Sequence, residues 1–183
     1  MQSKTTVMAT EQVMEKNKTV IDNHAIEPTS NLVTDERETL SPTEEEKRKK
    51  EVEKFIHSKV SGKQFLDYMV MIEELTEEET NMPYRNAIYN KCRYFVTWCL
   101  VHLTGPNRTL QKEFSIHEGN INGHHHVWLE YKGFYIDGTL AQFYPEKEGI
   151  LVISKDEANS LHYYSQATYS LIAWIEKEEN SEF

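Results

Sequence analysis

Residues 123–139, Gly-His-His-His-Val-Trp-Leu-Glu-Tyr-Lys-Gly-Phe-Tyr-Ile-Asp-Gly-Thr, decide the fold of this 183-residue chain. Aromatic, β-branched and polar residues flank Lys132-Gly133, a pattern typical of two β-strands joined by a tight turn. If the turn has two residues, Tyr131 pairs with Phe134 across the hairpin. The segment therefore predicts an antiparallel hairpin whose register is set by its turn.

This register brings a histidine and an aspartate to one face of the hairpin. Side chains alternate between the two faces of a strand, so one face carries His126, Trp128, Glu130, Tyr135, Asp137 and Thr139. His126 and Asp137 become diagonal neighbours with backbones about 7–8 Å apart, within reach of an imidazole–carboxylate hydrogen bond. A three-residue turn would move Asp137 to the opposite face. The pairing of His126 with Asp137 thus depends on the register.

The residues before the hairpin favour helices. Ser41-Pro42-Thr43-Glu44 is typical of a helix start, with a serine cap, proline at the first helical position and an acidic third residue. Residues 90–103 are apolar on almost every side, which indicates a buried central helix. Gly105-Pro106 would end that helix.

The pattern after this helix changes to the period of a strand. Alternation from Leu110 to Ile116 predicts a strand, and the segment 119–123 predicts a turn before the hairpin. Residues 149–153 predict another buried strand, and Tyr169 is expected in the final helix. Helices followed by antiparallel strands predict an α+β fold, with a helical N-terminal half packed on an antiparallel β-sheet.

Composition divides the chain into one domain and two tails. Residues 1–40 contain no aromatic residue and no glycine and are rich in Thr, Asn, Glu and Lys, so we expect a disordered arm. A single α+β domain is expected at 41–178, and residues 179–183 would form a C-terminal tail.

Charge and cysteine content exclude several classes of protein. A net charge of −10 argues against binding to nucleic acid or to anionic membranes. No apolar run is long enough for a membrane span, and no secretory signal is recognisable. Cys92 and Cys99 are seven residues apart on one predicted helix, about 10 Å along its axis, too far for a disulfide. A cytoplasmic protein, or one secreted by a signal-peptide-independent route, is expected.

Cys92 is the candidate nucleophile. It falls in the first turn of its predicted helix, where free N–H groups and the helix dipole favour a thiolate. A neighbouring His126 could shuttle the proton, and Asp137 could orient that histidine. Cys99 lies two turns further along the helix, and we interpret it as a structural thiol in the core.

This ordered set of residues resembles the papain-like and transglutaminase-like cysteine enzymes. The resemblance covers residues 84–143 and includes the pattern HVWLEYKGFYIDGTLAQF, with Cys92, His126 and Asp137 in the family's order. It implies Cys92 as nucleophile, His126 as general base and acid, and Asp137 as the orienting carboxylate. Asn86 is a candidate for binding the oxyanion. Gly138 departs from the family's commoner proline after the aspartate.

The implied function is that of a cysteine-dependent hydrolase or acyltransferase acting on an amide bond of a protein or peptide substrate. Peptide hydrolysis, glutamine deamidation and transamidation share an acyl-enzyme, and the sequence does not choose among them. No cofactor is required for this chemistry. The oligomeric state is not predicted.

Two alternative interpretations of the hairpin stay open. His124, His126 and Glu130 form a His-x-His-x-x-x-Glu pattern on one face, which resembles the metal-binding strand of cupins. The helical first half of the domain argues against a cupin, which is almost entirely β. The second alternative is a catalytically inactive binding module built on the same fold.

Overall fold

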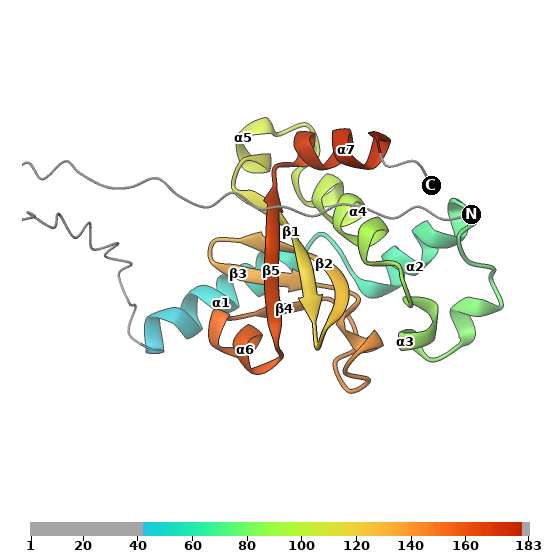
Figure 1. The fold of residues 1–183 in the computed structure, drawn as a ribbon, viewed down its shortest axis with the longest axis horizontal. Coiled ribbons are helices and arrows are strands. Elements are labelled where there is room, and N and C mark those ends of the chain that lie inside the picture. The colour runs from blue at the N-terminus through green and yellow to red at the C-terminus, as the bar shows by residue number, and fades with distance from the viewer. Residues whose placement is uncertain (1–41, 181–183) are drawn as a thin grey trace, which may run out of the picture. The chain divides into compact units, whose positions relative to one another are not determined.

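The computed structural model describes residues 42–180 (Figure 1). The elements in chain order are α1 (Pro42–His57), α2 (Gly62–Met71), η1 (Glu79–Asn81), α3 (Tyr84–Ala87), α4 (Cys92–Thr104), α5 (Arg108–Gln111), β1 (Phe114–Ile121), β2 (His124–Tyr131), β3 (Phe134–Asp137), η2 (Leu140–Gln142), β4 (Leu151–Ile153), α6 (Lys155–Ser160), β5 (Tyr163–Tyr169) and α7 (Leu171–Asn180). The predicted arm 1–40 and the cap at Ser41 lie outside the described residues, as do the last three residues of the predicted tail.

Helices precede an antiparallel sheet, as the sequence predicts for an α+β fold. The sheet has five strands in the order β4-β3-β2-β1-β5, and every neighbouring pair is antiparallel. β2 and β3 therefore lie inside the sheet, while β4 and β5 form its edges. Among residues 42–180, no helix is both long and apolar enough to cross a membrane.

The central hairpin has the predicted register. Tyr131 pairs with Phe134, and Leu129 pairs with Ile136. The turn residues Lys132 and Gly133 both have positive φ, 52° and 85°. This is the requirement of a type I′ turn, whose twist matches that of the two strands it joins.

The first strand of the sheet differs from the sequence prediction. Leu110 belongs to α5, a single helical turn capped by the Asn107 side chain, and β1 begins only at Phe114. The predicted turn at 119–123 is wrong, because β1 continues to Ile121. The chain reverses at Asn122-Gly123, where both residues have positive φ. The reason is that an Asn-Gly pair is itself a complete two-residue hairpin turn.

The last strand of the sheet is β5. Tyr169, expected in the final helix, closes β5, and α7 begins at Leu171. β5 is an edge strand whose side chains are largely exposed, so its pattern is weakly apolar. Pairing with β1 establishes it as a strand.

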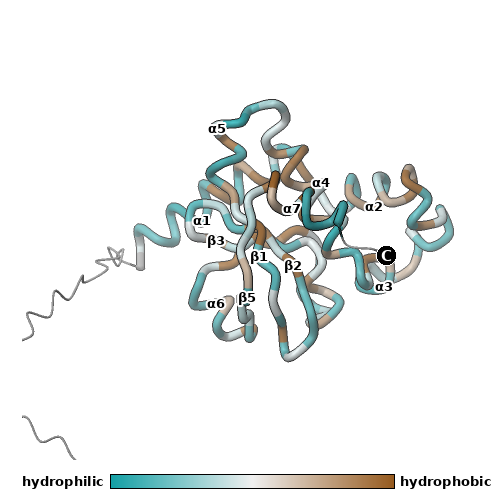
Figure 2. Tube along the Cα trace, turned by 45° about the horizontal axis from the view of Figure 1, so that its top comes forward, coloured by the Kyte–Doolittle hydropathy of each residue, from teal (hydrophilic) through white to brown (hydrophobic). Residues whose placement is uncertain are grey.

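One face of the sheet carries the main core. α4 packs on β2, α1 on β4 and α7 on β1. The buried apolar residues of these helices and strands form one cluster, which includes Ile56, Phe95, Leu103, Val127, Leu129, Ile136 and Trp174. Figure 2 shows apolar residues concentrated along α4 and hydrophilic residues along much of α1. The all-round apolarity predicted for the central helix thus corresponds to α4, which is buried on most of its sides.

The opposite face is covered by α6 and the segment after β3. A smaller cluster there contains Ile121, Leu140, Ile153 and Ala158. α6 begins with a complete capping box, in which Ser154 and Glu157 exchange hydrogen bonds. This second layer covers the face on which His126 and Asp137 lie.

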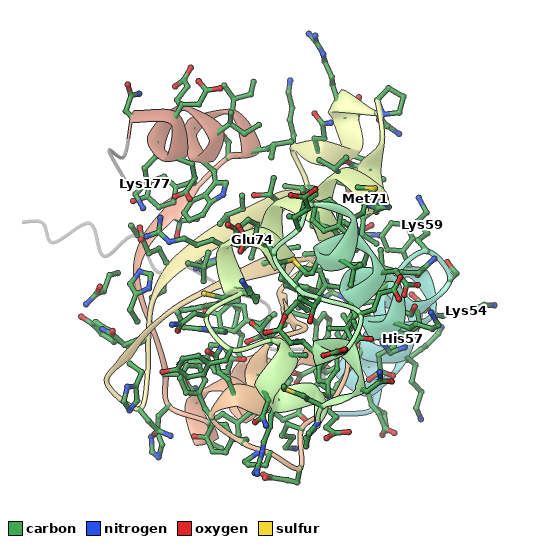
Figure 3. All side chains as sticks on the ribbon, turned by 90° about the vertical axis from the view of Figure 1, so that its right-hand side faces the viewer. Lys54, His57, Lys59, Met71, Glu74 and Lys177 are labelled. Atoms are coloured by element: carbon green, nitrogen blue, oxygen red, sulfur yellow. The ribbon has the colours of Figure 1, made fainter. Side chains whose placement is uncertain are left out.

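The C-terminal end of α1 is fixed to the rest of the domain by two hydrogen bonds. His57 Nε2 lies 2.8 Å from Ile150 O, and Lys59 Nζ donates to Leu103 O at 2.8 Å. Figure 3 labels His57 and Lys59 at this junction. α1 is thereby tied both to the end of α4 and to the approach to β4.

We expect the central turn to tolerate changes only where the new residue accepts positive φ. Gly133→Ala should lower the free energy of unfolding by about 1–2 kcal/mol, the cost of a left-handed L-residue. Lys132→Asn should leave it unchanged or raise it, because asparagine is favoured at such positions. Urea denaturation of both variants tests the pair. Equal destabilisation by the two substitutions would contradict a type I′ turn.

Candidate active site

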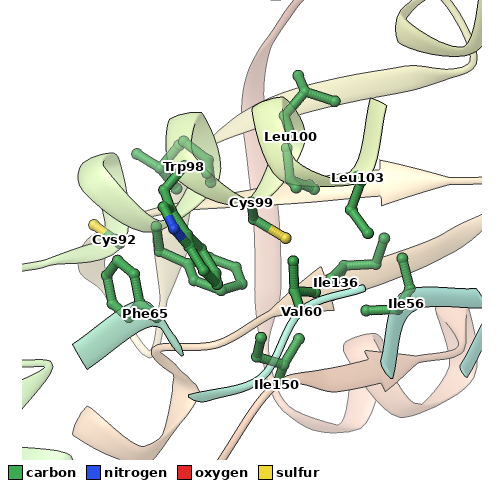
Figure 4. Packing of buried hydrophobic residues seen from close by; sticks show 14 of the residues in the cluster. Ile56, Val60, Phe65, Cys92, Trp98, Cys99, Leu100, Leu103, Ile136 and Ile150 are labelled. Atoms are coloured by element: carbon green, nitrogen blue, oxygen red, sulfur yellow. The ribbon is translucent and has the colours of Figure 1, made fainter. Parts of the chain in front are cut away.

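Cys92 is the first residue of α4, as the sequence predicts. The residue is 7% exposed and belongs to the main core cluster. Figure 4 shows its Sγ at the beginning of the helix, on the side away from the other labelled residues. The preceding Lys91 donates from Nζ to Glu74 Oε2 at 2.8 Å, and Tyr94 OH donates to Glu74 Oε1 at 2.5 Å. Glu74 therefore fixes the first turn of α4, and with it the thiol.

Asp137 is fully buried and accepts four hydrogen bonds. Oδ1 accepts from the Thr139 backbone N at 2.7 Å and from Thr139 Oγ1 at 3.0 Å. Oδ2 accepts from His126 Nε2 at 2.6 Å and from the Tyr163 hydroxyl at 2.7 Å. The Asp-x-Thr sequence therefore provides the hydrogen-bond donors for the carboxylate locally. Thr139 donates to one carboxylate oxygen, and the other oxygen faces the histidine.

His126 is hydrogen-bonded to the Asp137 carboxylate and lies near the Cys92 thiol. The residue is 0% exposed, and its Nε2 is engaged by Asp137. The nearby Cys92 thiol also acts on the imidazole and raises its pKa, although the two side chains are not joined by a hydrogen bond. The predicted histidine and aspartate are thus hydrogen-bonded to each other, with the predicted cysteine close to them.

Charge at this group is concentrated on the imidazole and the carboxylate. Burial opposes the charged imidazolium, but the Asp137 carboxylate, its hydrogen bond to the ring and the nearby Cys92 thiol outweigh it and raise the pKa of His126 to about 9. Burial would raise the pKa of Asp137, but the imidazolium and the hydrogen bonds hold it below its usual value. At neutral pH the site holds an imidazolium–carboxylate pair.

Trp128 supports the imidazole, as expected from its position two residues after His126. The two rings are nearly parallel, with centroids 6.0 Å apart and an interplanar angle of 18°. Phe143 meets the imidazole edge-on, at 5.1 Å. These rings exclude water from the histidine and restrict its orientation.

The absence of a side chain at Gly138 lets α4 lie close to the end of β3, beside the aspartate. A Cβ at this position would overlap the ring of Phe95, one turn after Cys92. Tyr84 OH donates to Gly138 O at 2.8 Å. The glycine at this position therefore permits direct packing of α4 against the end of β3.

A pocket of about 440 Å³ opens beside the thiol. Its lining includes Tyr89, Asn90, Cys92, Arg93, His124, His125, Gln142 and Phe143. Sequence reasoning missed Gln142, although it stands within the quoted pattern. Its Nε2 donates to Thr139 O at 3.0 Å and lies 3.4 Å from His126 Nδ1. Gln142 therefore offers an amide between the pocket and the imidazole.

Asn86, the predicted oxyanion residue, lies elsewhere. It is exposed in α3, and the residues that line the pocket do not include it. No hydrogen bond of the Asn86 side chain is formed with a residue of the site among residues 42–180. Tyr163 was also missed, because it belongs to the edge strand β5 and follows Asp137 by 26 residues.

The residues of the alternative metal site are engaged separately. His124 is exposed and stacks on Phe143, and Glu130 contacts His117 and Lys155. Within residues 42–180, no group of three or more His, Cys, Asp or Glu side chains is arranged to hold a metal ion. The His-x-His-x-x-x-Glu pattern is thus not assembled as a ligand set.

Glu118 ties the flanks of the site to the last helix. Its carboxylate contacts Arg93, which follows Cys92, and His125, which precedes His126. Lys177 of α7 donates to both of its oxygens, at 2.8 and 2.7 Å. Burial would raise the pKa of Glu118, but these partners lower it to about 2. The carboxylate is therefore charged wherever the domain is folded near neutral pH.

Comparison with known proteins identifies no relative. No protein-family model matches the sequence, and neither the curated proteins nor the solved structures include a significant match.

Removing the Tyr163 hydroxyl should destabilise the protein through Asp137. We expect Tyr163→Phe to lower the free energy of unfolding by about 1.5–3 kcal/mol, the range for a hydrogen bond to a charged group. The neighbouring Tyr164→Phe is the matched control, since Tyr164 is 66% exposed. Urea denaturation of both variants provides the measurement. Equal stabilities of the two variants would show that Asp137 does not need this donor.

The imidazole of His126 should titrate near pH 9, above its usual range. Because its pKa is higher in the folded state, its stabilising contribution is complete below about pH 6.5 and is lost as the pH rises through about 9. NMR titration of the His126 ring provides the measurement. In Asp137→Asn the midpoint should fall markedly, since burial then acts without the opposing charge. A midpoint near 6.5 in the wild type would contradict the buried ion pair.

Proposed function

We propose that this chain is a cysteine-dependent enzyme that transfers or hydrolyses the acyl group of an amide through Cys92. The observation that carries the proposal is the buried hydrogen bond between His126 and Asp137, with Cys92 near the imidazole at the start of α4. The resemblance to the papain-like and transglutaminase-like enzymes supports it, as does the helix-then-sheet order of the domain. We infer that the domain has the core of that superfamily.

The first chemical step forms an acyl-enzyme. The Cys92 thiolate attacks the amide carbonyl carbon, forming a carbon–sulfur bond and an oxyanion. His126 gives a proton to the departing nitrogen as the carbon–nitrogen bond breaks. Asp137 holds the imidazole by Nε2 throughout and balances its charge.

The second step releases the acyl group. Water or an amine attacks the thioester while neutral His126 accepts its proton, and the Cys92 thiolate leaves. Water gives a carboxylic acid, and an amine gives a new amide. Peptide hydrolysis, side-chain deamidation and transamidation therefore differ in the second nucleophile and in how the substrate lies in the pocket.

Two donors are available for the oxyanion. The backbone N–H of Cys92 is at the first position of α4, where a helix leaves its N–H groups without intrahelical partners. The Gln142 amide lines the same pocket. A donor correctly aimed at an oxyanion contributes about 10²–10³ in rate. We assign this role to the Cys92 N–H with Gln142, in place of Asn86.

The substrate we propose is a protein or peptide segment. The pocket mouth is formed by exposed Tyr89 and His124, and half-buried Phe143 lies beside them. Aromatic side chains at an open pocket suit contact with a polypeptide surface. Arg93 and two histidines line the pocket, so its immediate surroundings are less acidic than the chain as a whole.

Acylation of the thiol tests the mechanism. On incubation with p-nitrophenyl acetate, mass spectrometry should find an acetyl group on the Cys92 peptide and none on Cys99. Burial raises the pKa of Cys99 and makes it inert. Cys92→Ala should abolish the adduct without unfolding the protein. Cys99→Ala should keep it and mainly lower stability, because Cys99 points into the core (Figure 4).

Asp137→Asn is the control for an activated thiol. It should slow acetylation of Cys92 strongly while leaving the residue in place. If Cys92 reacts no faster than free cysteine and Asp137→Asn changes nothing, the chain is a binding module and the proposed mechanism is wrong.

A further inference from the structure

A second imidazole–carboxylate pair lies on the same face of the sheet. His117 of β1 is 8% exposed, and its Nε2 lies 2.7 Å from Glu130 Oε2 of β2. This short contact between the imidazole and the carboxylate is not aligned as a hydrogen bond. The other ring nitrogen, Nδ1, lies 2.9 Å from Ser165 Oγ of β5. The three side chains form a serine–histidine–glutamate chain across three strands.

The second group is separated from the first by an indole ring. Trp128 stacks on His117 at 5.7 Å between centroids and on His126 at 6.0 Å. Each imidazole therefore has its own carboxylate, with an apolar ring between the two. The mechanism proposed for Cys92 makes no use of His117.

Glu130 is a fixed negative charge beside His117. Lys155 Nζ lies 2.9 Å from the same carboxylate oxygen. Burial would raise the pKa of Glu130, but His117 and Lys155 lower it to about 2. A charged carboxylate behind an imidazole orients the ring and stabilises the imidazolium that forms when it accepts a proton.

A β-bulge directs the serine toward the imidazole. The pairing of β1 with β5 shifts after Glu118, so that Gly119 pairs with Ser165 and Gln166 is an extra residue. A Cβ on Gly119 would clash with Tyr164 O, so this close approach of the strands requires glycine. Bulges re-aim side chains and are frequent beside functional sites. Here the bulge leaves an exposed Ser165 against a buried His117.

We propose that Ser165, His117 and Glu130 form a second nucleophilic site, which accepts small activated acyl or phosphonyl groups. His117 Nδ1 takes the proton of the Ser165 hydroxyl as Oγ bonds to the electrophilic carbon or phosphorus. The bond to the leaving group breaks. Fluoride departs as the anion while the proton stays on His117, whereas an alcohol leaving group takes up that proton. Thr168 Oγ1 is further from Nδ1, at 3.4 Å, which favours Ser165 as the nucleophile.

The test uses a fluorophosphonate probe on the Cys92→Ala chain, so that the first thiol does not compete. Peptide mapping should place the phosphonyl group on Ser165 about 100-fold faster than on Ser160, the low end of what a positioned general base contributes. Ser160 is a matched control, since it is exposed and its hydroxyl donates only to a backbone carbonyl. His117→Gln should reduce labelling of Ser165 to the rate of Ser160, and Glu130→Gln should reduce it partly.

The comparison of Ser165 with Ser160 needs no change at the second site, so it does not depend on how the variants fold. Equal labelling of the two serines would overturn the proposal. So would labelling of Ser165 that is undiminished in a folded His117→Gln chain. Because the first thiol is absent from these experiments, their result is independent of whether Cys92 is catalytic.

Discussion

The structure around the candidate site depends on one buried charge. Asp137 has no exposed surface, and an isolated carboxylate in such a place would be strongly disfavoured. Four hydrogen bonds and one imidazolium compensate for its burial. The donors come from β2, from the residues after β3 and from β5. The requirement to satisfy a single carboxylate therefore fixes three separate parts of the chain relative to one another.

The same requirement also sets the orientation of the imidazole. A histidine whose Nε2 is held by a carboxylate presents its other nitrogen toward the pocket side, where Cys92 and Gln142 lie. Trp128 and Phe143 restrict the ring, and Gly138 lets α4 pack closely against the end of β3. Geometry of this kind holds one ring nitrogen on the carboxylate and turns the other toward Gln142 and the pocket.

Local sequence signals predicted the parts of the site that are close together in the chain. The Lys132-Gly133 turn determines the hairpin register and thus the contact of His126 with Asp137, and the change from turn to apolar helix located Cys92. Gln142 and Tyr163 could not be found in this way, because their roles depend on how η2 and β5 return to the hairpin. Asn86 was predicted to bind the oxyanion by analogy of position. It is exposed in α3 and does not line the pocket. The Asn122-Gly123 turn did carry a clear local signal, and the length of β1 would have followed from it.

The network around Glu118 joins residues from early and late parts of the chain. Its carboxylate joins Arg93 and His125, the neighbours of the cysteine and the histidine, to Lys177 in the last helix. Tyr163, which completes the shell of Asp137, also comes late in the chain. Synthesis therefore delivers Cys92 and His126 before the groups that hold Glu118 and Asp137 in place. The hydrogen-bond network around the site is complete only when β5 and α7 have joined the sheet.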